Sequence, residues 1–105
     1  MPRAQLVTIW WRDIPTQVNA QLGRERFQAL LPRRFQRAVD EAAVAAGLTQ
    51  ASDYVAEWRR ETEPWTGATD AAAMQAAADA AAGRLDADYP RERLQTIAAA
   101  GGFDR

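Results

Sequence analysis

The sequence contains no cysteine and no histidine among its 105 residues. Without cysteine the chain has no disulfide framework and no thiolate chemistry. Zinc sites built on cysteine or histidine are excluded, and so are nucleophiles activated by a histidine base. Calcium or magnesium bound only by oxygen would need regularly spaced acidic residues, and no stretch has the spacing of a calcium loop. We therefore expect no metal and no cofactor.

Long apolar runs are also missing. Nothing approaches the ~20 consecutive apolar residues of a membrane span, and the segment from Met1 to Arg3 leads into the chain without the apolar region of a signal peptide. We expect a cytoplasmic protein that does not associate with a membrane.

Lysine is absent as well, so all thirteen basic residues are arginine, against fourteen acidic residues and a net charge of −1. Residues 1–60 contain nine arginines and six acidic residues, whereas residues 61–105 contain four and eight. Arginine grips carboxylates and phosphates through its planar fork, although GC-rich coding also replaces lysine by arginine. Nucleic-acid-binding domains are usually basic, so the overall charge argues against nucleic acid as a partner.

Hydrophobic residues make up 48% of the chain, which is enough for one core. We expect a single domain over 1–105, with a strand–helix–strand core at 1–62 and an alanine-rich helical part at 68–100. Alanine buries little area, and burial contributes only about 25 cal/mol per Å². A small domain of this composition is therefore expected to gain from a protein partner or a second copy.

Two segments near the beginning of the chain predict a hairpin. Gln5–Arg12 is rich in β-branched and aromatic residues and predicts a strand. Pro15 ends it, because proline cannot donate to a strand ladder. Thr16–Leu22 alternates apolar and polar residues with a period of two, which predicts a second, half-buried strand. Residues 24–31 are expected to form a short helical lead-in to the next element.

Three helical segments follow. Pro32 fits the first turn of a helix that ends at Gly47. Thr69 and Asp70 cap a long alanine-rich helix that reaches about Asp86. A last short helix begins at Pro90. The expected apolar stripes are Phe35, Val39, Ala42 and Ala46 in the first helix, Met74, Ala78, Ala81 and Leu85 in the second, and Leu94, Ile97 and Ala98 in the third, which Gly101 and Gly102 close.

The segment from residue 49 to residue 61 is less clear. Residues 49–53 are turn-forming. From Tyr54 to Glu61, a helix would place Tyr54, Val55 and Trp58 on one face, and a strand would place Tyr54, Ala56 and Trp58 on one side. We favour the strand, because a two-stranded hairpin is marginal and a third strand completes a sheet. The result is an α+β fold, a small antiparallel sheet in the order β-β-α-β-α-α with helices packed on one face.

The first strand is apolar on both sides, which is unusual for a surface strand. One face carries Val7, Ile9 and Trp11, and the other carries Leu6, Thr8, Trp10 and Arg12. Either helices cover both faces, or a tryptophan lies at the surface, where this residue type is enriched in binding hot spots. If the two strands pair, the side of Gln17, Asn19 and Gln21 also carries one of these tryptophans.

Two similar aromatic and charged clusters, at residues 10–13 and 57–60, meet if residues 54–61 form a strand beside the first. Arg12 and Arg60 could then bind a carboxylate or phosphate while tryptophan supplies a stacking face. The alternative is a salt bridge from Asp13 or Glu57 to arginine, with the indoles in the core. The candidate partner-binding residues are Trp10, Trp11, Arg12, Asp13, Tyr54, Trp58, Arg59 and Arg60.

Candidate acid–base groups are Asp13, Tyr54, Glu57 and Glu61. No spacing singles out a carboxylate pair of the kind that catalyses proton transfer, so we assign no catalytic residue. The glycine-rich phosphate-binding motifs are missing.

The chain resembles a small bacterial family labelled "virulence factor". The resemblance covers about the first 60 residues, and its most specific part is the Trp-Arg-Asp-Ile-Pro run that ends at Pro15. The matching segments are Val7 to Pro15, then Leu31 and Pro32 with Phe35 and Ala38, then Ala46, Gly47 and Leu48, and finally Tyr54 with Glu57, Trp58 and Arg59.

The resemblance implies no catalytic residues. Some members carry a similar domain at the end of longer helical-repeat proteins, and stand-alone members accompany enzymes of folate- and corrinoid-dependent one-carbon metabolism. We expect a non-catalytic accessory subunit or adaptor that binds a protein partner, such as one of these enzymes, as a hetero-complex, or a second copy as a homodimer. The alternative is a small anion- or nucleic-acid-binding domain that uses Arg12, Arg59 and Arg60.

Overall fold

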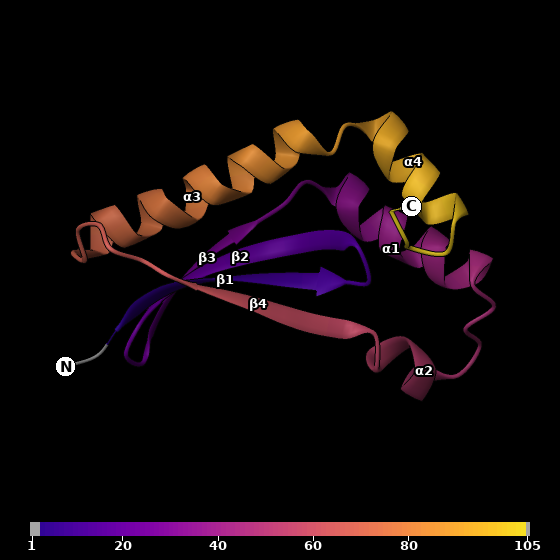
Figure 1. Cartoon of the computed structure of the whole chain (residues 1–105), viewed down its shortest axis with the longest axis horizontal. Coiled ribbons are helices and arrows are strands. Elements are labelled where there is room, and N and C mark those ends of the chain that lie inside the picture. The colour runs from indigo at the N-terminus through magenta and orange to yellow at the C-terminus, as the bar shows by residue number, and fades with distance from the viewer. Residues whose placement is uncertain (1–2, 105) are drawn as a thin grey trace.

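The computed structural model describes residues 3–104, and within them four strands form one antiparallel sheet in the order β3-β2-β1-β4 (Figure 1). The strands are β1 (Ala4–Trp11), β2 (Ile14–Leu22), β3 (Glu25–Leu30) and β4 (Trp58–Pro64). The helices are α1 (Arg33–Ala45), α2 (Ala51–Val55), α3 (Ala71–Asp88) and α4 (Arg91–Ala99). The α+β class, the antiparallel sheet and the helices packed against it are confirmed. The element order is β-β-β-α-α-β-α-α, so the predicted order lacked one strand and one short helix.

The helical lead-in predicted at residues 24–31 is wrong, because this segment forms strand β3 and pairs with β2. Gly23, with a φ of 60°, makes the turn between them. Phe27 lies opposite Ala20 and Ala29 lies opposite Val18, so the apolar residues of β3 share a side with those of β2. The composition of the segment is compatible with a helix, but its apolar residues alternate with a period of two. Pairing with β2 therefore selects the strand.

The segment from residue 49 to residue 61 contains both structures that the sequence left open. Instead of a turn at residues 49–53, α2 occupies Ala51–Val55, and the strand begins only at Trp58. A hydrogen bond from a distant part of the sequence fixes the short helix, since the indole Nε1 of Trp11 donates to the Tyr54 carbonyl at 2.9 Å. The predicted position of the strand beside β1 is confirmed.

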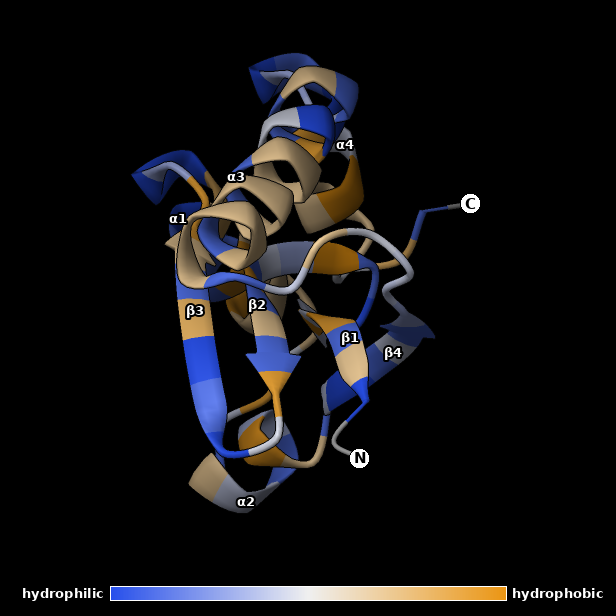
Figure 2. Cartoon of the chain, turned by 90° about the vertical axis from the view of Figure 1, so that its left-hand side faces the viewer, coloured by the Kyte–Doolittle hydropathy of each residue, from blue (hydrophilic) through white to orange (hydrophobic). Residues whose placement is uncertain are grey.

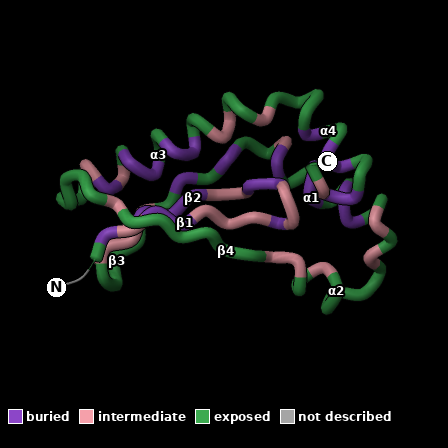
Figure 3. The backbone as a smooth tube through the Cα atoms, in the orientation of Figure 1, coloured by how far each residue is buried: buried purple, intermediate pink, exposed green. Residues whose placement is uncertain are grey.

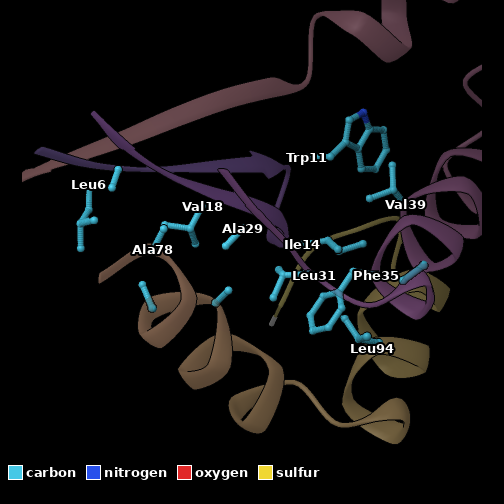
Figure 4. Close-up of a cluster of buried hydrophobic side chains, with 14 of the residues drawn as sticks. Leu6, Trp11, Ile14, Val18, Ala29, Leu31, Phe35, Val39, Ala78 and Leu94 are labelled. Carbon is cyan, nitrogen blue, oxygen red and sulfur yellow. The ribbon is translucent and has the colours of Figure 1, made fainter. Parts of the chain in front are cut away.

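Helix α3 lies along one face of the sheet, over β2 and β3 (Figures 1 and 2). The side chains on its inner side are almost all alanine, and their small size lets the helix backbone come close to the strands. α1 and α4 pack against each other at one end of the sheet. Figure 4 shows Leu6, Val18 and Ala29 beside Ala78 under α3, and Phe35 beside Leu94 where α1 meets α4. The buried residues of α3 are Met74, Ala77, Ala78, Ala81 and Ala82.

The predicted beginning of α3 is confirmed by its capping bond. The Asp70 carboxylate accepts a hydrogen bond from the backbone N–H of Ala73 at 2.9 Å. We expect Asp70→Ala to lower the free energy of unfolding by about 1 kcal/mol, measured by urea denaturation. Asp79→Ala is the control, because Asp79 only accepts a bond from Gln75 on the exposed side of the helix, and its loss costs about 0.5 kcal/mol or less. Equal losses would contradict a capping role for Asp70.

Within residues 3–104, no helix has the length and apolar character needed to cross a membrane.

Candidate partner-binding site

Trp11 lies in the core and not at the surface. Its side chain is 0% exposed, and its ring centroid is 5.6 Å from that of Tyr54. Tyr54 in turn meets Trp58 edge to face at 6.0 Å. Figure 4 shows the Trp11 indole beside Val39 of α1. Of these three aromatic residues, Trp58 alone extends from the core toward a surface groove.

Arg12 is engaged within the fold. It has a φ of 51° in the turn between β1 and β2. Its guanidinium donates to the Gly101 carbonyl at 2.8 Å and to the Glu57 carboxylate at 3.0 Å, and lies 4.5 Å from the ring centroid of Phe103. These contacts fasten the β1–β2 turn to the segment after α4. The predicted alternative, a salt bridge from Glu57 to arginine, is confirmed.

Trp10, Asp13 and Arg59 meet on the α3 side of the sheet, where α3 does not reach. The Arg59 guanidinium lies 5.0 Å from the Trp10 ring centroid and forms ion pairs with Glu61 at 2.9 Å and Asp13 at 3.7 Å. The Trp10 ring also meets Tyr89 edge to face, with the ring centroids 6.3 Å apart. Asp13 and Glu61 pair with Arg59, so among residues 3–104 Arg59 is not a free cation on this surface.

Tyr89 borders the same surface, and its electrostatics reflect a half-buried position. Burial raises the pKa of its hydroxyl above the usual value of 10.0, and the nearby Arg93 opposes the shift. The Arg93 guanidinium lies 4.1 Å from the Tyr89 ring centroid, and its bond to Asp104 raises the pKa of Arg93. Both groups keep their ordinary charge near neutral pH and act as packing and ion-pair partners.

The face of the sheet turned away from α3, called here the open face, has a different character. In an antiparallel sheet, directly opposed residues lie on the same side. Ile9 lies opposite Gln17 on β2 and opposite Arg60 on β4, and Gln17 lies opposite Leu30 on β3. One row across all four strands therefore combines an amide, a cation and two aliphatic side chains. Gln17 and Asn19 of β2 line this side together with Trp58, and Trp11, a tryptophan of the first strand, lies opposite Trp58.

A groove of about 530 Å³ lies on the open face, between β3, the beginning of α1 and β4. We call it the open-face groove. Its lining includes three arginines and no acidic residue. None of the three forms an ion pair with another residue in the range 3–104. The lining residues are Ile9, Thr16, Gln17, Asn19, Arg26, Leu30, Leu31, Pro32, Arg33, Gln36, Trp58 and Arg60.

Strand β4 separates the two surfaces. Its side chains alternate, so Trp58 and Arg60 line the open-face groove, while Arg59 and Glu61 border the hollow beside Trp10 on the other side. β4 is an edge of the sheet, and Figure 3 shows it exposed for most of its length. The strand therefore presents a basic side and a side rich in carboxylates.

The structure divides the predicted site residues among three places. Trp58 and Arg60 belong to the open-face groove, and Trp10, Asp13 and Arg59 belong to the surface beside Tyr89 on the α3 side of the sheet. Trp11, Arg12 and Tyr54 hold the two surfaces in place from inside the fold. In the sequence, Arg26 and Arg33 stand out only as part of a basic stretch that leads into the first helix and were not among the candidate partner-binding residues, although the period-two pattern of residues 25–30 would have placed Arg26 on the side of the amides.

In the part of the chain that the structure describes, no three acidic side chains gather closely enough to hold a metal ion. No curated protein and no solved structure matches the chain. The family model described as Virulence factor matches residues 9–98, well beyond the first 60 residues that suggested the resemblance. The chain therefore belongs to the Virulence factor family.

Proposed function

We propose that this protein is a non-catalytic accessory subunit or adaptor that binds a protein partner through the open-face groove and the adjoining edge of β4. The observation that carries the proposal is the groove itself, in which apolar, amide and unpaired cationic side chains meet on a sheet face turned away from α3. An enzyme of folate- or corrinoid-dependent one-carbon metabolism is the first partner to test, on the family resemblance alone.

The composition of the groove supports a protein partner. Tryptophan and arginine are the residue types most enriched in binding hot spots, and the groove contains both. Within residues 3–104, Leu30 at the border of the groove is one of three large hydrophobic residues that are exposed, at 69%. An edge strand with free backbone groups can also accept a strand from another chain, and β4 runs along the groove.

The structure decides which mutations can test this function. Trp10 and Trp11 pack within the fold, so their loss would confuse binding with stability. Leu30 and Arg60 are the better probes. Leu30 is exposed in the groove, and Arg60 is exposed on β4. Neither accounts for a large part of the core.

The experiment is a tagged pull-down from the native cell at moderate salt, with partners identified by mass spectrometry. We expect a stoichiometric partner whose recovery falls about tenfold with Leu30→Ser combined with Arg60→Ser, as loss of a hot spot predicts. Val44→Ser is the matched control, because Val44 is 81% exposed on α1 outside the groove, and its recovery should equal the wild type. A partner retained by the double variant, or no partner at all, would contradict the proposal.

A further inference from the structure

We infer that the open-face groove binds an extended acidic peptide segment of the partner, in which carboxylates flank an apolar residue. This inference rests on the proposed function, because it names the chemistry that the same groove recognises. The charge, the polar groups and the dimensions of the groove support it.

The charge of the groove favours an anionic ligand. Arg26 comes from β3, Arg33 from the first turn of α1 and Arg60 from β4, so cations stand on three sides. The lining carries three positive charges and no negative one, on a chain whose net charge is −1. The fold has therefore concentrated positive charge here, and an anionic partner is electrostatically complementary.

Four of the other arginines serve the fold itself through ion pairs. Arg12, Arg59 and Arg93 each bind a carboxylate of the same chain, and Arg34 binds Asp86. The three arginines of the groove have no such partner within residues 3–104. Their planar forks bind carboxylates bidentately, so the carboxylates of another chain can fill the positions that the fold leaves open.

Between the arginines, the floor of the groove suits a peptide. The side-chain Nε2 of Gln17 donates to the Asn19 oxygen at 3.2 Å, which orients the Gln17 amide and leaves its own oxygen to accept a peptide N–H. Asn19 is only 2% exposed, so the oxygen that accepts this bond is fixed in the floor of the groove. Ile9 and Leu30 lie beside these amides in the groove and form an apolar contact for one aliphatic side chain.

The dimensions set the length of the segment. Arg26 and Arg60 lie on the two edge strands, with β2 and β1 between them. Three strand spacings of about 4.8 Å separate the two strands by about 14 Å. Arg60 shares a row with Leu30, and Arg26 lies four residues before Leu30 on β3, which adds about 13 Å along the strands. The two arginines are therefore about 20 Å apart, and an extended segment of five or six residues, at about 3.3 Å per residue, reaches both with an acidic side chain near each end.

Single-stranded nucleic acid fits the groove less well. Such ligands stack successive bases on several aromatic side chains, and Trp58 is the one aromatic residue of the lining. The other side of β4 carries Glu61 and Glu63, which repel a phosphate backbone that runs past the strand edge. The observations therefore favour carboxylates on a peptide.

The test is fluorescence anisotropy with the full chain and a labelled peptide of sequence Glu-Asp-Leu-Glu-Asp. We expect saturable binding that weakens about tenfold or more when the acidic residues are replaced by their amides, since charge-assisted bonds supply the affinity. Binding should also weaken several-fold as salt rises from about 50 mM to about 300 mM.

The variant Arg26→Gln, Arg33→Gln, Arg60→Gln should lose about tenfold or more in peptide affinity. The matched control Arg37→Gln, Arg84→Gln, Arg91→Gln removes the same charge from exposed positions outside the groove and should bind as the wild type does. Circular dichroism checks that both variants fold. Equal losses in the two variants would overturn the inference, because a general charge effect would then explain the binding.

Three further outcomes separate this inference from the proposed function. An oligouridylate that binds more tightly than the acidic peptide would overturn the inference in favour of nucleic acid. If the pull-down recovers a partner that is lost with the combined Leu30→Ser and Arg60→Ser variant but the acidic peptide fails to bind, the protein-binding function stands and the acidic segment is wrong. If both experiments fail, the groove is not a docking surface.

Discussion

Replacing Trp11 by alanine is expected to lower the free energy of unfolding by about 3–5 kcal/mol, the range for a large buried aromatic side chain. Trp11 is 0% exposed and packs at the junction of β1, α1 and α2. Its loss would also leave the Tyr54 carbonyl without the indole donor. Small domains have a total stability of about 5–15 kcal/mol, so a large part of the stability would be lost.

Phenylalanine substitutions separate the hydrogen bond from the packing. Trp11→Phe keeps an aromatic ring but removes the bond from the indole to Tyr54. Trp10→Phe removes no bond, because the buried Trp10 Nε1 has no partner within residues 3–104. We expect Trp11→Phe to be the more destabilising by about 1–2 kcal/mol, measured by urea denaturation followed by circular dichroism. If the two variants are equally stable, the indole bond does not hold α2 in place.

The burial of Trp11 also explains why the first strand is apolar on both sides. The sequence pattern showed two apolar faces but could not show what covers each of them. Leu6 faces α3 (Figure 4). Trp11 meets Tyr54 of α2 and Gly102 beyond α4. The elements that cover the Trp11 side of the strand are distant in the sequence, so the local pattern could not reveal them.

The elements with a strong local signal were predictable. The spacing of apolar residues indicates β2 and α1, β-branched and aromatic residues indicate β1, and the alanine content with the Asp70 cap indicates α3. β3 and α2 were not predicted, because pairing with β2 fixes β3, and the bond from Trp11 helps to fix α2. In both segments a nonlocal contact decides between structures that the local composition allows.

The candidate site was half predictable for the same reason. Trp58 and Arg60 were found as part of an aromatic and charged cluster, and both line the open-face groove. Arg26 and Arg33 reach that groove only because β3 returns beside β2 and α1 begins where β3 ends. A charged residue has no period of its own that would mark it, so its role appears only when the strand order is known.

The glycine after α4 offers the sharpest test of how the end of the described chain supports this site. Gly102 has a φ of 98°, a conformation that costs a residue with a side chain about 1–3 kcal/mol. A Cβ there would lie 2.9 Å from the Trp11 ring and 3.2 Å from the Arg12 Cδ. Asp13 also donates its backbone N–H to the Gly102 carbonyl at 2.9 Å, so the backbone is held in place at this point.

We therefore expect Gly102→Ala to lower the free energy of unfolding by about 2–4 kcal/mol, from backbone strain and overpacking together. Gly47→Ala is the matched control, because its φ is 72° but nothing lies within 4 Å of the added Cβ, so strain alone remains and costs about 1–2 kcal/mol. Urea denaturation of both variants measures the difference. Equal losses would mean that the segment after α4 moves away from Trp11 without resistance, and that overpacking against Trp11 and Arg12 costs nothing.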